Sequence, residues 1–271
     1  MAAQEPRRTL DLGARRRLWV LEDGVFITDA GNLLGGSRRM RLRGAMHAAL
    51  VRTEGALVLL DAGFGPEVPA PLAGHYELRR ERSLPEAVRA AGSEPEEVTH
   101  VVLSHLDPDH VGWALGEGRA FPAATVYAQR EALEEARRMP EKDGRRLAVP
   151  AVERGVSEGW LELLEGDGEV APGVRVEVRS GHSAGHQISW IEGGEAAALF
   201  TADLAPAKIW LNPDLIAGVD TDPEAARRNR IEVLTEAEER GAFVILYHEP
   251  RDALVTVRRT AEGFEGVPLE G

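Results

Sequence analysis

Apolar and polar positions along the chain predict strands first and an alternation of strands and helices afterwards. From Leu18 to Asp61 the pattern predicts short strands broken by glycine, and the run 55–61 is apolar throughout, as in a strand buried on both faces. Apolar runs later in the chain predict further strands at 98–104, 174–178, 187–192, 196–202 and 242–247, and a strand-helix unit at 124–138.

Helix signals fall between these strands. Ser83 and Glu86 form a capping-box pattern that opens a helix ending at Gly92, and helical spacing is also found in the second half of 124–138 and over 224–240. The stretches 64–82 and 140–157 mix Pro, Gly and charge, and are predicted to be loops that form a lid or cap. This order of elements predicts an α/β fold, a four-layer αββα sandwich.

The 271 residues fit one domain, 1–271, of which the Arg-rich segment 1–17 is expected to be poorly ordered or peripheral. No run approaches the roughly 18 apolar residues of a membrane span, and the N-terminus lacks a signal-peptide core. We therefore expect a cytoplasmic protein that does not bind membranes. The oligomeric state stays open, a homodimer included.

Charge and cysteine content narrow the chemistry. A formal net charge of −13 argues against a nucleic-acid partner, because such proteins displace counterions with Lys and Arg. The absence of cysteine excludes disulfides, thiolate zinc sites and cysteine nucleophiles. Any metal must be held by His, Asp or Glu, and we expect a small-molecule substrate.

The run Ser-His-Leu-Asp-Pro-Asp-His-Val-Gly from Ser104 concentrates metal-binding side chains after a predicted strand. In extended chain, residues two apart point the same way, so His105, Asp107 and Asp109 converge. Pro108 allows the chain to bend into a helix, which brings His110 to the same point. Such a cluster is costly without a cation, because like charges repel.

Three further candidates lie beside apolar strands: His186, Asp203 and His248. Together with the run they make a set of nitrogen and carboxylate ligands sufficient for two divalent ions with room for water. The predicted metal ligands are His105, Asp107, Asp109, His110, His186, Asp203 and His248.

This ordered set resembles the metallo-β-lactamase superfamily, whose signature is His-x-His-x-Asp-His, a later Gly-His-x-x-Gly-His turn, an Asp after a strand and a final His. The wording of the motifs is most similar to the acyl-homoserine lactonase and organophosphate hydrolase branch. The resemblance implies a first metal on His105, Asp107 and His186, a second on Asp109, His110 and His248, and Asp203 as the bridge. One residue departs from the signature, because Asp107 stands where the second His is expected.

Supporting roles follow from the same resemblance. Asp61 and His182 are expected behind the ligands, where they would orient them. Trp113, Lys208 and Trp210 are candidates for the substrate pocket. Lactonases of this branch place a Tyr shortly after the bridging Asp, whereas 203–210 contains none, so Lys208 is the candidate substitute near the leaving group.

We therefore predict a metal-dependent hydrolase that attacks an ester, lactone or phosphoester with a metal-activated hydroxide, with Asp109 as the catalytic residue. Zinc is the expected metal, with Mn or Fe as alternatives at the site containing Asp107, since a carboxylate favours harder metals. The first rival is a di-iron oxidoreductase of flavodiiron type, reducing oxygen or nitric oxide with a separate electron donor. The second is a non-catalytic metal-binding protein.

Overall fold

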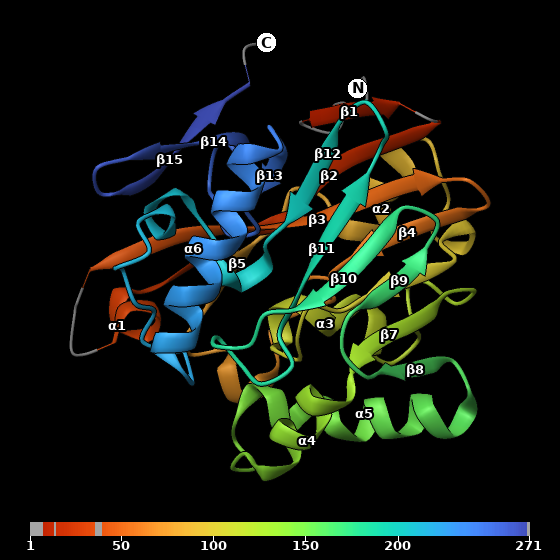
Figure 1. Ribbon diagram of the computed structural model, residues 1–271. Helices are drawn as coiled ribbons and strands as arrows, with labels where there is room; N and C mark the ends of the chain where they lie inside the picture. Colours follow the sequence, from red (N-terminus) through yellow and green to blue (C-terminus); the bar gives the residue numbers. More distant parts are fainter. Residues whose placement is uncertain (1–7, 14, 36–39, 270–271) are drawn as a thin grey trace.

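Two β-sheets form the centre of the computed structural model, which describes residues 8–13, 15–35 and 40–269 (Figure 1). The first sheet has the order β1 (Arg8–Gly13), β2 (Arg16–Asp29), β3 (Arg41–Thr53), β4 (Ala56–Leu60), β6 (His100–Val102), β7 (Thr125–Gln129) and β8 (Leu161–Leu164), with β5 (Glu77–Arg79) paired to β2. The second has the order β15 (Gly263–Pro268), β14 (Leu254–Thr260), β13 (Phe243–Ile245), β12 (Ala197–Phe200), β11 (Gln187–Glu192), β10 (Val174–Val178) and β9 (Gly168–Ala171).

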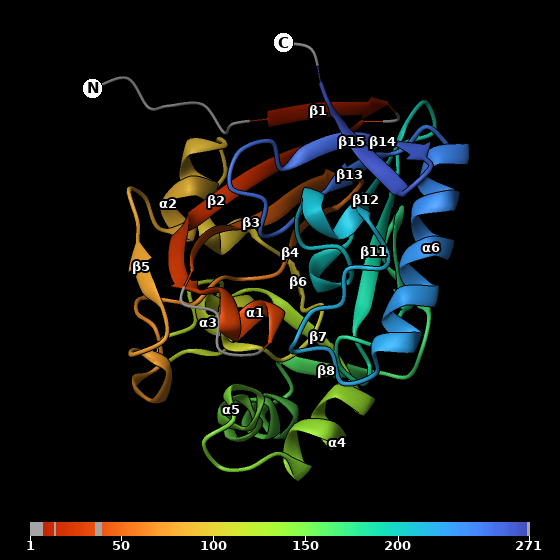
Figure 2. The same cartoon turned by 90° about the vertical axis from the view of Figure 1, so that its left-hand side faces the viewer.

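Helices cover the outer faces of both sheets (Figure 2). The α-helices are α1 (Ala30–Leu34), α2 (Leu84–Ala90), α3 (Pro108–Leu115), α4 (Arg130–Arg138), α5 (Gly144–Glu158) and α6 (Pro223–Glu239). Short 3₁₀ turns occur at Ala70–Leu72, Pro95–Glu97, Ala202–Leu204 and Lys208–Leu211. None of the described helices is long and apolar enough to cross a membrane.

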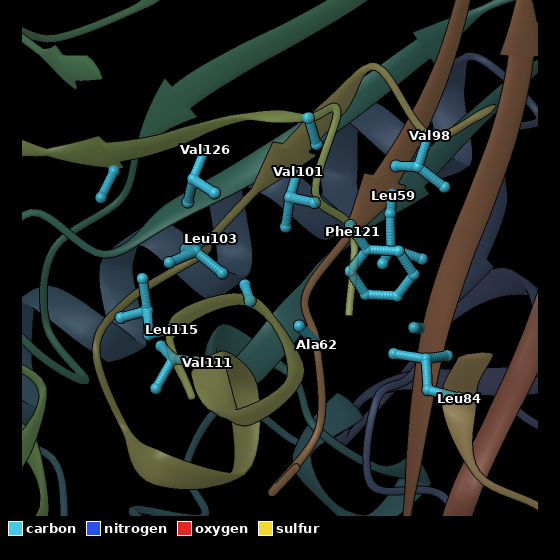
Figure 3. Packing of buried hydrophobic residues seen from close by; sticks show 14 of the residues in the cluster. Leu59, Ala62, Leu84, Val98, Val101, Leu103, Val111, Leu115, Phe121 and Val126 are labelled. Atoms are coloured by element: carbon cyan, nitrogen blue, oxygen red, sulfur yellow. The ribbon is translucent and has the colours of Figure 1, made fainter. Parts of the chain in front are cut away.

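Three apolar cores separate four layers. One lies between the first sheet and α2 to α5 (Figure 3), one between the sheets, and one between the second sheet and α6. Strand β4 serves two of them, because Leu57 and Leu59 belong to the first core while Val58 and Leu60 belong to the second. Successive strand residues point to opposite faces, so this buried run stabilises both layers. The predicted αββα sandwich is confirmed.

Strands β2 and β3 correct the expectation of short strands broken by glycine. They are 14 and 13 residues long, and Gly24 stays paired with Met46, directly after a bulge at Asp23 where the pairing register shifts. Gly44 stays in the ladder because the ring of Phe26 lies where a side chain would be, with 2.4 Å between its Cζ and an added Cβ. Glycine here allows close packing inside a strand rather than ending it.

The stretch 140–157 was expected to be a loop, but α5 occupies most of it. Asp143 caps the helix by accepting a hydrogen bond from the Arg145 amide at 2.9 Å, and a face containing Ala148 and Val152 is buried. Pro150 lies inside the helix on its exposed side. Tertiary burial therefore outweighs the loss of one backbone hydrogen bond at the proline.

Other boundaries differ less. The capping box at Ser83, the unit 124–138 and the helix after Asp222 are confirmed. Within 64–82 there is only a 3₁₀ turn and the short β5. The antiparallel hairpin of β14 and β15 was missed, because the end of β14 and most of β15 are polar or exposed and break the apolar pattern. In the segment 1–17, residues 8–13 form the edge strand β1, while residues 1–7 and 14 lie outside the described part.

Candidate metal centre

The predicted ligands come from loops at the ends of strands. His105 and Asp107 follow β6, Asp203 follows β12 and His248 follows β13. Asp107 precedes α3 in extended conformation, with φ −67° and ψ 144°, and Pro108 is the first residue of that helix. The expected bend at Pro108 is confirmed, and it carries Asp109 and His110 into the first turn of α3.

Two groups of side chains meet at this point. Ligand atoms of Asp109, His110 and His248 lie within 4.8 Å of one another, and we call these residues the His110 group. The second group, which we call the His105 group, consists of His105, Asp107 and His182. In it, Asp107 Oδ2 lies 3.4 Å from His105 Nε2 and 3.3 Å from His182 Nε2.

Asp203 lies between the groups. Its Oδ1 is 3.4 Å from His110 Nε2 and 3.3 Å from His248 Nε2, and its Oδ2 is 3.5 Å from His182 Nε2. One carboxylate therefore faces both groups with different oxygens, which is the geometry of a bridging ligand.

Hydrogen bonds behind the rings orient the histidines of both groups. His110 Nδ1 donates to Asp61 Oδ2 at 2.7 Å, and His248 Nδ1 donates to the Ala45 carbonyl at 2.7 Å. His182 Nδ1 lies 3.2 Å from Asp220 Oδ1 and donates to it, since a carboxylate only accepts.

Ser104 completes the pattern behind His105. Its hydroxyl donates to Asp61 Oδ2 at 2.7 Å and therefore accepts from His105 Nδ1 at 2.9 Å. With Nδ1 protonated in each neutral ring, the lone pair of Nε2 points into the site, which is the form that binds a metal.

His186 is placed differently from its expected role as a ligand. Its Nε2 accepts a hydrogen bond from the Asp203 backbone amide at 3.3 Å, and its buried Nδ1 has no hydrogen-bond partner among the described residues. The lone pair that a metal would need is thus turned toward the backbone. The structure brings His182, expected only as a supporting residue, into the cluster and places His186 behind it.

Buried polar atoms show that the residues fit a cation. His105 Nε2, His110 Nε2 and Asp203 Oδ1 are buried and make no hydrogen bond within the described chain, although His110 Nε2 and Asp203 Oδ1 are 3.4 Å apart. Orphaned buried groups of this kind are rare and costly. Two divalent ions, one beside His105 and one beside His110 with Asp203 between them, would satisfy all three.

The pKa shifts of the histidines show that the aspartates give the site an excess of negative charge. Burial lowers the pKa of His182, but hydrogen bonds to Asp107 and Asp220 and the charge of Asp203 outweigh it and raise this pKa to about 9. Burial also lowers the pKa of His110 and His248, but the charges of Asp203 and Asp109 and the hydrogen bonds to Asp203 together outweigh it, so both pKa values are raised. In the metal-free protein, protons on these rings balance the aspartates.

Asp61 braces both groups, as expected. Besides His110, its carboxylate accepts the Ser104 amide at 2.7 Å and the Ser104 hydroxyl, and the residue is fully buried. Its φ of 59° lies in the left-handed region, which Asp and Asn tolerate better than most residues. The backbone turn after β4 therefore aims this carboxylate at the ligands.

Sequence reasoning missed Arg145. Its Nε donates to Asp107 Oδ1 at 2.5 Å, and its Nη1 is 3.3 Å from Glu135 Oε2. Burial raises the pKa of Asp107, but the charge of Arg145 together with the charge and hydrogen bonds of His105 and His182 outweighs it and holds the pKa well below its usual range. A buried ligand carboxylate signals the need for a cation behind it, but locating that cation requires α5, which was expected to be a loop.

A cavity of about 480 Å³ opens onto His182, Asp203 and His248. Most of its wall is apolar and includes Phe26, Leu33, Leu42, Ile209, Trp210 and Val219. Lys208 also lines it, with its ammonium 2.6 Å from Asp252 Oδ2.

Trp113 does not line this cavity, contrary to expectation. Its ring nitrogen donates to Asp23 Oδ1 at 2.8 Å, and its ring packs against the core under α3. Asp23 is buried, and the hydrogen bond to it holds the indole of Trp113 on the side away from the cavity. Trp113 therefore has a packing role.

Tyr76, from the segment 64–82, is a second residue that sequence reasoning missed. Its ring packs edge-on against Phe26, with 5.5 Å between centroids, and against Phe64 at 5.4 Å. Burial and then the charges of Asp109, Asp107 and Asp203 raise the pKa of its hydroxyl. The hydroxyl therefore lies near enough to these aspartates for their charges to affect it.

Comparison with known proteins places these observations in a family. The profile described as "Metallo-beta-lactamase superfamily" matches residues 43–249. The N-acyl homoserine lactonase AiiA of Bacillus thuringiensis subsp. kurstaki is 29% identical over 189 residues, covering 65% of this chain and 70% of that protein. The lactonase AiiB of Agrobacterium fabrum is 26% identical over 278 residues, covering 94% and 97%.

Solved structures share the fold. AidC, a dizinc quorum-quenching lactonase in complex with a product, superposes with a TM-score of 0.81 at 20% identity, covering 97% of each chain. The hydrolase AbOPH of the β-lactamase superfamily superposes with a TM-score of 0.80 at 18% identity, covering 99% of each chain.

Proposed function

Because the chain belongs to the metallo-β-lactamase superfamily, we propose that it is a metal-dependent hydrolase that cleaves ester or lactone bonds of small molecules. The observation that carries this proposal is the convergence of four Nε2 atoms and the carboxylates of Asp107, Asp109 and Asp203 at the mouth of an apolar cavity. The lactonase relatives support hydrolysis and do not favour the di-iron oxidoreductase or the non-catalytic protein.

We assign one metal to His105, Asp107 and His182 and the other to Asp109, His110 and His248, with Asp203 shared. Two divalent cations, zinc first and Mn or Fe as the alternative beside Asp107, would lower the pKa of water to about 7 and polarise the carbonyl. Asp109 would orient the attacking water, because its Oδ2 faces the centre 3.4 Å from His248 Nε2.

The cavity supports a substrate with an apolar acyl part. Phe26, Leu42, Trp210 and their neighbours offer little to a charged chain but would bury methylene groups favourably. N-acyl homoserine lactones, named for the relatives, are the first substrates to test. A cytoplasmic location, a single domain and the absence of nucleic-acid partners stay predictions.

We also propose Tyr76 as the proton donor to the leaving alkoxide. A tyrosine phenol is protonated at neutral pH, the raised pKa of Tyr76 favours that form further, and an alkoxide is basic enough to take the proton. Tyr76→Phe should slow lactone hydrolysis by about 10²-fold, within the range of general acid catalysis, and leave p-nitrophenyl esters unaffected because their leaving group needs no proton. Equal losses on both substrates would contradict this role.

The central test is metal analysis of protein purified without added metal, followed by assays with lactones and aryl esters. Two equivalents of zinc, with turnover lost on chelation and regained on adding zinc, are expected. Protein that turns over neither substrate class with zinc, manganese or iron would refute the hydrolase. Two equivalents of iron with oxygen consumption would favour the oxidoreductase.

A further inference from the structure

We propose that Arg145 is a positioning residue and that it accounts for the aspartate at position 107. Arg145 places a hydrogen-bond donor behind this ligand. A histidine at position 107 would be held in the tautomer with its proton on Nε2, which cannot bind a metal. This inference rests on the proposed metal centre. It concerns how the His105 group is built and what it would accept.

Asp107 divides its two oxygens between protein and site. Oδ1 accepts from Arg145 Nε at 2.5 Å, whereas Oδ2 faces His105 Nε2 and His182 Nε2 at 3.4 and 3.3 Å. A carboxylate can accept from a donor with one oxygen and offer the other to a cation. Asp107 is therefore a single-oxygen ligand whose other oxygen is already occupied.

Arg145 is itself held in place. Its side chain is 9% exposed, and Glu135 Oε2 lies 3.3 Å from its Nη1. The other oxygen of Glu135 accepts the Ala184 amide at 3.1 Å, in the turn that carries His182. A planar guanidinium fixed by two carboxylates has little freedom to turn away, so its Nε–H stays aimed at position 107.

The four histidines of the centre have the opposite arrangement, because each has an acceptor behind Nδ1. An imidazole at position 107 would meet the Arg145 donor instead. It could satisfy that donor through the Nδ1 lone pair only by carrying its proton on Nε2. The Nε2 facing the site would then be a donor, and the first metal would lose a ligand.

The test measures Zn²⁺ dissociation constants by competition with a chromophoric chelator, and the Co²⁺ absorption spectrum, for a set of variants. Asp107→His restores the family signature, yet we expect it to weaken the first site about 10- to 100-fold, the cost of a wrongly oriented ligand. Adding Arg145→Gln should recover the loss, because the amide oxygen lies as many bonds from Cα as Nε and accepts from Nδ1.

Two controls separate this effect from a loss of folding. Arg145→Lys keeps a donor, so it should leave Asp107 functional and fail to rescue Asp107→His. Arg145→Gln alone can still donate to Asp107 and should bind two metals. The metal-free unfolding curve of each variant shows whether the fold persists.

The inference is overturned if Asp107→His alone binds both ions as tightly as the wild type. It is also overturned if the double variant, folded, binds no better than Asp107→His. A wild type that binds no metal refutes the proposed function and this inference together, whereas two tightly bound ions in both wild type and Asp107→His refute only the inference.

Discussion

The two halves of the metal centre differ in what stands behind their ligands. In the His110 group, the sheets supply acceptors, the Asp61 carboxylate after β4 and the Ala45 carbonyl of β3. In the His105 group, support also comes from the helical layer, where Arg145 of α5 donates to Asp107. The comparison teaches that the residue type of a ligand follows from its neighbour: acceptors orient histidines, and a donor requires a carboxylate.

The strongest test of this comparison substitutes His182 and His186 separately and asks which of the two binds a metal. His182→Ala should remove one metal equivalent and reduce activity beyond the roughly 100-fold that losing a residue behind a ligand costs. His186→Gln should keep both metals, because the amide oxygen can still accept the Asp203 amide. Metal analysis and lactone turnover measure both variants, and loss of a metal in His186→Gln alone would restore His186 as the ligand.

A smaller effect is expected at Asp61. Asp61→Ala should destabilise the protein by about 1–3 kcal/mol, because the buried Ser104 amide loses its acceptor. Asp61→Asn keeps that acceptor and tolerates the left-handed backbone, but its amide nitrogen would face His110 Nδ1. Denaturant unfolding should therefore separate the variants, while Zn²⁺ affinity falls in both. Unchanged affinity in Asp61→Asn would show that ring orientation does not limit the His110 group.

The raised histidine pKa values predict how the metal-free protein responds to pH. The pKa of His182 is about 9 in the folded protein and 6.5 in the unfolded protein, so the folded protein binds this proton more tightly. The resulting stabilisation is fully present below pH 6.5. This contribution is lost as pH rises from about 6.5 to 9, by up to about 1.4 kcal/mol per pH unit. In chelator-treated protein, the free energy of unfolding by urea should decline over this pH range. The decline should be less steep in His182→Gln. An equal slope in both proteins would contradict the assignment.

The smallest effect is expected for Lys208. Its ion pair with Asp252 is partly exposed, with side chains 30% and 34% accessible, so Lys208→Met should cost roughly 0–1 kcal/mol. Because Asp252 holds the ammonium, we expect kcat on lactones to change little, in contrast to Tyr76→Phe. A loss of kcat comparable to that of Tyr76→Phe would return Lys208 to the role near the leaving group suggested by the sequence.

The sequence was informative where local pattern and chemistry coincide. Buried strands such as 56–60 and the capping box at Ser83 follow from periodicity, and the run from Ser104 revealed the cluster because Pro108 made its bend predictable. The choice between His182 and His186 could not be made this way. It depends on the Asp203 amide and Asp220, which approach from distant parts of the chain.

The pockets and helices that surround the ligands were harder to predict. Arg145 was missed because the mixture of Pro, Gly and charge over 140–157 suggested a loop, and Tyr76 was missed because 64–82 has little periodicity. Trp113 follows the ligand run closely but is turned toward Asp23. Such contacts are decided by tertiary packing, on which a local pattern carries no information.

Pro150 has a consequence for motion. Lacking an amide hydrogen, it leaves the Arg146 carbonyl without its helical bond, so the first turn of α5 is tied to the rest of the helix by fewer hydrogen bonds. That turn carries Arg145, whereas Asp61 directly follows β4 and its amide donates to the Val102 carbonyl of β6. Amide exchange should therefore be faster for the backbone at the start of α5 than beside β4, although Asp107 and Glu135 hold the Arg145 side chain in place.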